Sequence, residues 1–422
     1  MSYDGKYYEI KNHYVSYGHE GGAVIYEPVN PDERAQTGIL VMHSDADYFG
    51  FIPCPELAKR GFYVMAANVH ESKSPLERKI EEVGFYLDKL REVPGIRKVI
   101  LLGHSGGATL MSCYQAVAEN GPEIFRTDAM IVKMPEIRKL TPADGVMFLD
   151  SNFGNGVMNI LSIDPMVTDE HSSKNLDPRF DLFDPANGYD PAGAHYTKEF
   201  AAKYNRAQEE RFARVREYVH ERYLALEQGE GDYADDEPIT IPGGAQYAPD
   251  NRLFPQDISY LNHTQGEYPL IHADGSITNE VIYTRRPPKF RESRTRLLHG
   301  AAEATTVRTY LSSSTLKSNG YHVTETEVAG IDWDSNYCCT PGNVKHISSP
   351  LLILGLTGGY EFLASEIIYK NAVKTNDKTI AFVEGATHNF EPEHATEEFP
   401  GQYGDTVKLS FDYTAEWILE RF

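Results

Sequence analysis

The chain has 422 residues, and its 41% hydrophobic and 24% charged content is that of a globular protein with enough apolar mass for a large core. Its 62 acidic and 40 basic residues give a formal net charge of -22 at pH 7. Such a surface repels nucleic-acid phosphates and anionic lipid headgroups, so we expect neither nucleic acid nor a membrane as a partner.

The first 150 residues alternate between strand-like and helix-like segments, which predicts a mainly parallel sheet with helices on both faces. Strands are predicted at residues 22–27, 38–43, 62–68, 98–102 and 145–150, and helices at residues 55–61 and 75–93. Ser74 and Pro75 predict the start of the second helix, with the serine as N-cap and the proline at the first helical position.

The alternation stops after residue 150 and resumes near residue 348. The intervening stretch is rich in Asp, Pro, Tyr and Gly, and it predicts one long helix at 197–226, a second at 294–316 and an exposed acidic loop between them. Strands are again predicted from Pro350 and at 379–385, with a closing helix at 409–422. The chain therefore predicts an α/β core formed by residues 1–150 and 348–422, with a large, mostly helical domain inserted at 151–347.

A serine stands between glycines where the predicted strand 98–102 passes into a helix, in the sequence Gly103-His104-Ser105-Gly106-Gly107. A serine hydroxyl is a poor nucleophile until a base takes its proton. The G-x-S-x-G pattern holds the serine on a sharp strand-to-helix turn, where the helix N-terminus aims amides at a substrate oxygen. The pattern predicts a nucleophilic serine. The alternative is a glycine-rich turn whose serine only caps the helix.

On this motif the chain resembles the α/β-hydrolase superfamily, over residues 20–150 and 345–422 and not over the insertion. The resemblance implies a mainly parallel, doubly wound sheet and a catalytic serine, acid and histidine in that order along the chain. It implies His388 as the general base, in the loop that follows the strand 379–385. The other interpretation of His388 is a surface histidine in an acidic loop.

The resemblance offers two positions for the catalytic acid. The usual one is the turn after the strand that begins at Pro350, where the carboxylate that fits is Glu361. The rival is Asp150, at the tip of the strand 145–150, a position that some members of the superfamily use. We favour Glu361. Either carboxylate would hold the imidazole of His388 in its working tautomer and stabilise the imidazolium.

The resemblance also implies an oxyanion hole built from two backbone amides, those of Gly106 and, by position, Asp45. Many members of the superfamily have His-Gly where this chain has His43 and Ser44, so the match is partial. An anionic side chain beside an oxyanion is unfavourable unless it turns away or meets a cation, such as a substrate amine. We expect the Asp45 carboxylate to point elsewhere.

An insertion at this place forms a cap over the serine in the superfamily that the chain resembles, where it excludes water and shapes the substrate pockets. The insertion is rich in tyrosine, and aromatic walls suit a bulky or aromatic small molecule. Arg285 and Arg286 would either receive a substrate carboxylate or form a solvated turn.

These inferences predict a carboxylesterase-like serine hydrolase acting on a small-molecule substrate. It would cleave an ester, lactone or thioester through an acyl-enzyme on Ser105, with no metal or organic cofactor. Two alternatives stay open. One is a non-catalytic, ligand-binding homologue, favoured by the atypical acid turn and oxyanion loop, and the other is an acyltransferase that uses the same serine.

Four cysteines, at positions 54, 113, 338 and 339, form neither a disulfide framework nor a CxxC metal-binding pattern. The start of the chain lacks the pattern of a secretory signal, and no apolar run approaches the ~20 residues of a membrane span. We expect reduced thiols and a cytoplasmic protein, and we leave open whether it forms a homo-oligomer.

Overall fold

The computed structural model describes residues 3–170, 174–244, 251–288 and 302–422. The strands of its central sheet are β1 (Ile10–Ser16), β2 (Gly22–Pro28), β3 (Thr37–Val41), β4 (Tyr63–Ala67), β5 (Lys98–Ser105), β6 (Gly145–Ser151), β8 (His263–Ile271), β9 (Ile277–Tyr283), β13 (Leu351–Leu356) and β14 (Lys378–Val383). Two smaller sheets pair β7 (Pro238–Ile241) with β10 (Glu303–Thr306), and β11 (Lys317–Val323) with β12 (Val328–Asp332).

The helices are α1 (Pro53–Ala58), α2 (Leu76–Arg91), α3 (Gly106–Asn120), α4 (Asn155–Ser162), α5 (Lys198–Glu227), α6 (Leu253–Gln256), α8 (Val307–Ser313), α9 (Thr340–Asn343), α10 (Phe362–Asn371) and α11 (Thr406–Leu419). Among the described helices, none is both long enough and apolar enough to cross a membrane.

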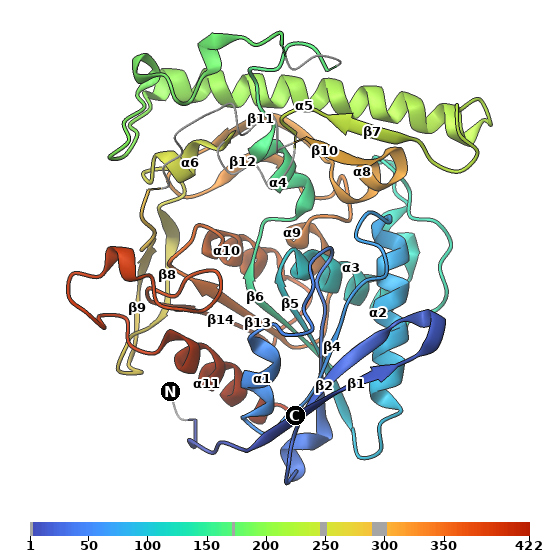
Figure 1. The fold of residues 1–422 in the computed structure, drawn as a ribbon, viewed down its shortest axis with the longest axis vertical. Helices are drawn as coiled ribbons and strands as arrows, with labels where there is room; N and C mark the ends of the chain where they lie inside the picture. Colours follow the sequence, from blue (N-terminus) through green and yellow to red (C-terminus); the bar gives the residue numbers. More distant parts are fainter. Residues whose placement is uncertain (1–2, 171–173, 245–250, 289–301) are drawn as a thin grey trace.

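The central sheet has the strand order β1-β2-β4-β3-β5-β6-β13-β14-β8-β9 (Figure 1). Neighbouring strands from β4 to β8 pair in parallel, whereas the pairs β1–β2, β2–β4 and β8–β9 are antiparallel. Parallel neighbours need crossover connections, and the helices α2, α3 and α10 follow β4, β5 and β13 in this way. This is the topology of the α/β-hydrolase fold, so the predicted fold class is confirmed.

Helices cover both faces of the central sheet. Helices α1 and α11 pack on one face, and α2, α3 and α10 pack on the other. Successive side chains of a buried strand point to opposite faces. In β13, Leu352 and Leu354 accordingly belong to the core under α1 and α11, whereas Leu351 and Ile353 belong to the core under α3 and α10.

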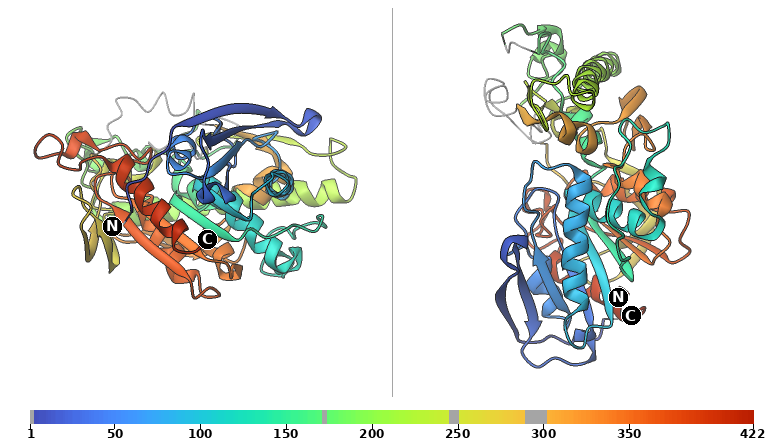
Figure 2. Two further views of the ribbon diagram at one scale, coloured as in Figure 1. Left: turned by 90° about the horizontal axis from the view of Figure 1, so that it is seen from below. Right: turned by 90° about the vertical axis from the view of Figure 1, so that its right-hand side faces the viewer.

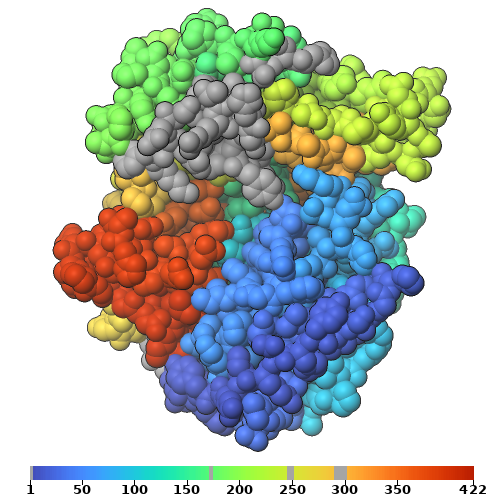
Figure 3. All heavy atoms as spheres, in the orientation of Figure 1, coloured from blue at the N-terminus to red at the C-terminus, as the bar shows by residue number. Residues whose placement is uncertain are grey.

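Much of the segment between β6 and β13 forms a layer beyond the carboxyl ends of the core strands, with α5 lying across it, whereas β8 and β9 lie beside β14 (Figures 1 and 2). Helix α4 connects the end of β6 to this layer and packs on α5, which also packs on α8 and β11. In the space-filling view, the N-terminal (blue) and C-terminal (red) parts of the chain lie side by side below the green and yellow insertion (Figure 3).

The predicted insertion at 151–347 is not wholly separate from the core. Strands β8 and β9 lie within it in sequence, yet they extend the central sheet, because Leu270 and Ile271 of β8 pair in parallel with Phe382 and Val383 of β14. This pairing covers an edge of β14 that would otherwise expose unpaired backbone groups. The remaining strands of the insertion form the two small sheets.

Two predicted helices also differ from the structure. Helix α2 begins at Leu76, with Pro75 at the N-cap, because the Ser74 hydroxyl donates to the carbonyl of Glu71 at 2.9 Å instead of capping the helix. The predicted helix 294–316 lies partly outside the described residues. Within them, β10 precedes a short α8, which is N-capped by the side chain of Thr306.

Candidate active site

Ser105 stands at the junction between β5 and α3, with φ 54° and ψ -126°. A positive φ is unfavourable for a residue with a Cβ, and such strain persists only where the surrounding structure holds it. This conformation is that of a serine on a sharp strand-to-helix turn. The geometry therefore agrees with the predicted nucleophile turn.

Two glycines around Ser105 are required by close backbone contacts. A Cβ on Gly103 would lie 2.6 Å from Cα of Ala108, and a Cβ on Gly107 would lie 2.7 Å from the carbonyl oxygen of Met42. Real Cβ atoms do not approach backbone atoms so closely, so the strand, the turn and the first helical residues fit together only with glycine at both positions.

His388 lies in the loop after β14, beside the Ser105 turn. Its ring is 4.4 Å from the ring of His104, centroid to centroid, and its carbonyl oxygen accepts a hydrogen bond of 2.7 Å from His104 Nε2. The Tyr48 hydroxyl in turn donates to His104 Nδ1 at 2.7 Å. Burial lowers the pKa of His104 well below its usual value, so it is a neutral residue that holds the His388 loop against β5.

The carboxylate that bonds to the His388 ring is Asp150, with Oδ2 2.6 Å from Nδ1. Asp150 is fully buried at the tip of β6, has φ 45°, and accepts a second hydrogen bond of 2.9 Å from the backbone N–H of Leu356. Of the two candidate acids, Asp150 is the one whose hydrogen bond to His388 the structure shows. Glu361 has helical φ and ψ directly before α10, and its Oε2 accepts from the backbone N–H of Tyr360 at 3.1 Å.

Glu361 nevertheless lies close to the pair. One ligand atom each of Asp150, Glu361 and His388 lie within 4.8 Å of one another, and this is the one group with metal-binding spacing in the described part of the chain. Two ligands of a tetrahedral zinc ion stand about 3.3 Å apart. The 2.6 Å between Asp150 and His388 is a direct hydrogen bond, which fits an acid–histidine pair better than two metal ligands.

Burial raises the pKa of Asp150 above its usual value. The hydrogen bond and charge of His388 lower it, whereas the charge of Glu361 raises it further. His388 and the backbone N–H of Leu356 therefore both favour the ionised form of Asp150 in this buried position.

The oxyanion loop differs from the expectation for Asp45. The backbone N–H groups of Asp45 and Ala46 both donate to His43 Nδ1, at 3.2 and 3.0 Å. The Asp45 carboxylate also turns toward His43, with Oδ1 2.7 Å from Nδ1. The amide and the carboxylate of Asp45 are thus both directed at His43.

The two arginines of the insertion have separate surroundings. Arg285 forms an ion pair of 2.9 Å with Glu384. Arg286 is buried, and its guanidinium donates to the carbonyl oxygens of Leu261 at 2.7 Å and Tyr260 at 2.6 Å. Burial lowers the pKa of Arg286 to about 10. It therefore stabilises the backbone of the insertion and is not part of a solvated turn.

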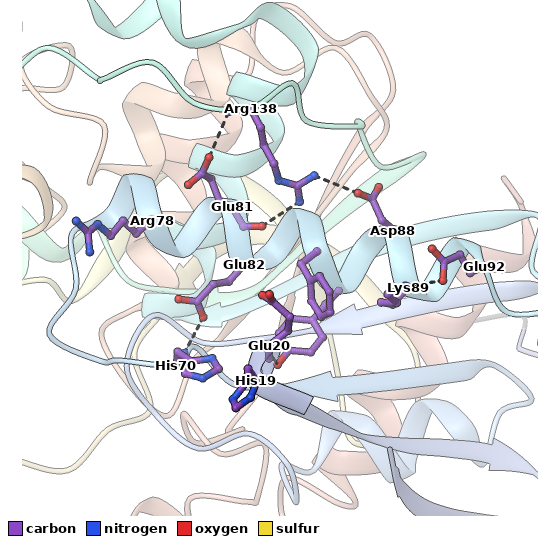
Figure 4. A pocket seen from close by; sticks show the side chains of 12 residues that line it. His19, Glu20, His70, Arg78, Glu81, Glu82, Asp88, Lys89, Glu92 and Arg138 are labelled. Carbon is purple, nitrogen blue, oxygen red and sulfur yellow. Dashed lines mark hydrogen bonds and ion pairs between the residues drawn. The ribbon is translucent and has the colours of Figure 1, made fainter. Parts of the chain in front are cut away.

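A surface pocket lies over α2 and the short turn at residues 18–20 (Figure 4). Several of its charged side chains are engaged with one another or with nearby backbone: Arg138 pairs with Asp88, Lys89 pairs with Glu92, and Glu82 accepts from the backbone N–H of His70. None of the predicted site residues lines it.

The His104–Tyr48 contact was not predicted from the sequence. His104 is the variable residue between glycine and serine in the motif, and Tyr48 lies in the loop after β3. Nothing in their spacing indicates that the two side chains meet, because the contact depends on how β3 and β5 lie side by side in the sheet.

No family model and no curated protein matches the chain. Among solved structures it is similar to a hypothetical protein, PA2218, from Pseudomonas aeruginosa, with 14% identity and a TM-score of 0.43 over 100% of this chain and 96% of that chain. It is also similar to esterase B from Lactobacillus rhamnosis, with 12% identity and a TM-score of 0.39 over 98% and 89%. At these values the assignment of an α/β-hydrolase fold rests on the strand order and the Ser105 turn of this chain.

Proposed function

We propose that this protein is a serine hydrolase of the carboxylesterase type, which cleaves an ester, lactone or thioester of a discrete small molecule through an acyl-enzyme on Ser105. The observation that carries the proposal is the hydrogen bond of 2.6 Å between His388 and the buried Asp150, beside the strained Ser105 turn. A histidine held by a buried carboxylate next to such a serine is the arrangement that activates a hydroxyl for attack.

In the first half of the reaction, His388 Nε2 takes the proton of Ser105 while Oγ bonds to the substrate carbonyl carbon and the C=O electron pair moves onto oxygen. The C=O bond then re-forms, and the bond to the leaving alkoxide or thiolate breaks. The leaving group takes the proton from His388. Asp150 accepts from Nδ1–H throughout and stabilises the imidazolium.

In the second half, water attacks the acyl carbon and gives its proton to His388. The tetrahedral intermediate collapses, the bond to Ser105 Oγ breaks, and Oγ recovers the proton from His388. The carboxylic acid leaves, and the resting residues are restored. Every proton in this cycle passes through His388.

We further propose that the layer around α4, α5 and α6 caps this site. Contacts between α6 and the β13–α10 turn support the proposal: the rings of Phe254 and Tyr360 lie 4.5 Å apart, and Arg252 Nη1 donates to the Tyr360 hydroxyl at 2.5 Å. Tyr360 precedes Glu361, so these contacts bring the layer close to the acid–histidine pair. A cap of this kind excludes water and favours a discrete small molecule over a polymer.

Turnover of a panel of p-nitrophenyl esters, lactones and thioesters tests the proposal. The variants are Ser105→Ala and, as a matched control, Ser410→Ala, which removes a buried hydroxyl of α11 that donates to the carbonyl of Thr406. We expect hydrolysis by the wild type and the control, and a loss of about 10,000-fold or more in Ser105→Ala. Binding without turnover would contradict the proposal and favour a ligand-binding protein. Faster transfer to an added alcohol than to water would favour an acyltransferase.

A further inference from the structure

Ser44 carries a buried hydroxyl that has no hydrogen-bond partner. Ser44 follows His43 in the loop after β3, and only 1% of its surface is exposed. Its Oγ finds no donor or acceptor among the residues that the structure describes. Burying a hydroxyl without a partner costs free energy, so a position of this kind is favourable only when another group supplies the missing bond.

The Ser44 hydroxyl faces the residue that follows the Ser105 turn. A Cβ on Gly106 would lie 2.9 Å from Ser44 Oγ and 3.2 Å from His43 Nε2. Gly106 is the first residue of α3, so its backbone N–H has no acceptor within the helix. The Ser44 hydroxyl thus lies next to Gly106, the residue that follows Ser105 in the chain.

The other backbone donor expected here is directed elsewhere. The Asp45 amide donates to His43 Nδ1 at 3.2 Å. Many members of the superfamily that the chain resembles have glycine at the position of Ser44, so they carry no hydroxyl there. In this chain the side chain of Ser44 can supply the donor that the Asp45 amide does not offer.

We propose that the Ser44 hydroxyl, together with the Gly106 amide, donates a hydrogen bond to the oxyanion that forms during attack by Ser105. The inference rests on the proposed serine hydrolase function and names a second hydrogen-bond donor to the oxyanion of that reaction. Ser44 keeps its proton throughout: its O–H bonds to the carbonyl oxygen as negative charge develops there, and the bond weakens when the C=O group re-forms. Donors placed in this way act on the transition state more than on the bound substrate.

Labelling of Ser105 by a fluorophosphonate tests this role, because the reagent also develops negative charge on an oxygen as it is attacked. Rate constants are measured for the wild type, Ser44→Ala, Ser44→Gly and the control Ser410→Ala, with thermal unfolding to verify that each is folded. The alanine and glycine variants both lack the hydroxyl but differ in volume. We expect labelling about 100-fold slower in both, and unchanged in the control.

Three results would overturn the inference, each for a different reason. If a folded Ser44→Ala or Ser44→Gly is labelled at the wild-type rate, the hydroxyl does not stabilise the oxyanion. If only one of the two is slow, the effect is one of packing. If the wild type itself is not labelled at Ser105, the proposed hydrolase function fails and the inference fails with it.

Discussion

Asp150 Oδ2 lies 2.6 Å from Nδ1 of His388, although 238 residues separate the two in the chain. The intervening insertion returns the chain to β13, which pairs with β6, and to β14, which pairs with β13. The loops at the carboxyl ends of β6 and β14 thereby meet beside the Ser105 turn. The acid and the base of the proposed enzyme are therefore brought together by the order of strands in the sheet.

Replacement of the two carboxylates should distinguish their roles. We expect Asp150→Asn to lower kcat for ester hydrolysis by about 1,000- to 10,000-fold, because His388 would lose the group that fixes its tautomer. Glu361→Gln should cost less than about tenfold. Steady-state kinetics on the same substrate provides the comparison, and a larger loss in Glu361→Gln would restore Glu361 as the acid.

The dependence of activity on pH should shift in Glu361→Gln. The pKa of Asp150 is raised by burial and raised further by the charge of Glu361. Removing that charge lowers the pKa of Asp150, so the ionised form persists to lower pH. The acid limb of the kcat/KM profile should therefore move to lower pH. A limb that stays in place or moves to higher pH would show that Glu361 does not act on the pair.

Lys79 predicts a pH-dependent contribution to stability. Its ammonium group donates to the carbonyl of Ser72 at 2.8 Å, and burial lowers its pKa to about 8 from 10.5. Between these values the unfolded chain binds a proton that the folded chain does not, so this contribution to the free energy of unfolding rises with pH. The stability of the wild type relative to Lys79→Met should increase by about 2 kcal/mol from pH 7 to pH 10.

Urea unfolding of both proteins at the two pH values measures this difference. Lys89→Met, at a partly exposed position of the same helix, serves as the control and should show no such increase. A constant difference between the wild type and Lys79→Met would mean that Lys79 titrates alike in the folded and unfolded chain.

The close contacts of Gly103 predict the cost of a side chain at the turn. Gly103→Ala would bring a Cβ within 2.6 Å of Cα of Ala108, which neither backbone can avoid without moving. We expect a loss of at least about 2 kcal/mol in the free energy of unfolding and a loss of activity. Gly50→Ala is the control, because a Cβ there meets nothing within 4 Å. Equal stability of the two variants would contradict the packing described for the turn.

The Ser105 turn could be predicted from the sequence because its determinants are local. The close approach that requires Gly103 occurs within the turn, to Ala108 five positions along the chain, whereas the one that requires Gly107 is to Met42, just after β3. The choice of His388 followed from the resemblance to the α/β-hydrolase superfamily, which implies a general base in the loop after the strand 379–385. These features depend on short segments whose residue types are typical of few other structures.

The carboxylate that bonds to His388 could not be predicted, because it depends on the directions in which the Asp150 and Glu361 side chains point. Asp150 and Glu361 both lie near His388, and the residue pattern does not tell which of the two carboxylates bonds to its imidazole. The positive φ of Asp150 accompanies a carboxylate aimed at the imidazole, whereas Glu361 turns back to the Tyr360 backbone. The hydrogen bond from the Asp45 amide to His43 likewise depends on the orientation of the His43 ring, which no residue pattern predicts.

Strands β8 and β9 of the insertion were not predicted, for a different reason. β8 and β9 carry a register shift between His263 and Glu267, so their polar and apolar residues do not alternate cleanly. β8 is paired with β14 at only two positions, Leu270 and Ile271. Tertiary pairing, rather than periodicity, therefore makes this segment part of the central sheet.

Mass-spectrometric location of a fluorophosphonate adduct on the wild-type protein tests the central claim most directly. The account predicts a single adduct on Ser105, absent from Ser105→Ala and retained in Ser410→Ala, with labelling strongly slowed in Asp150→Asn. A folded wild-type protein that carries no adduct, or carries it on another residue, would contradict the assignment of Ser105 as an activated nucleophile.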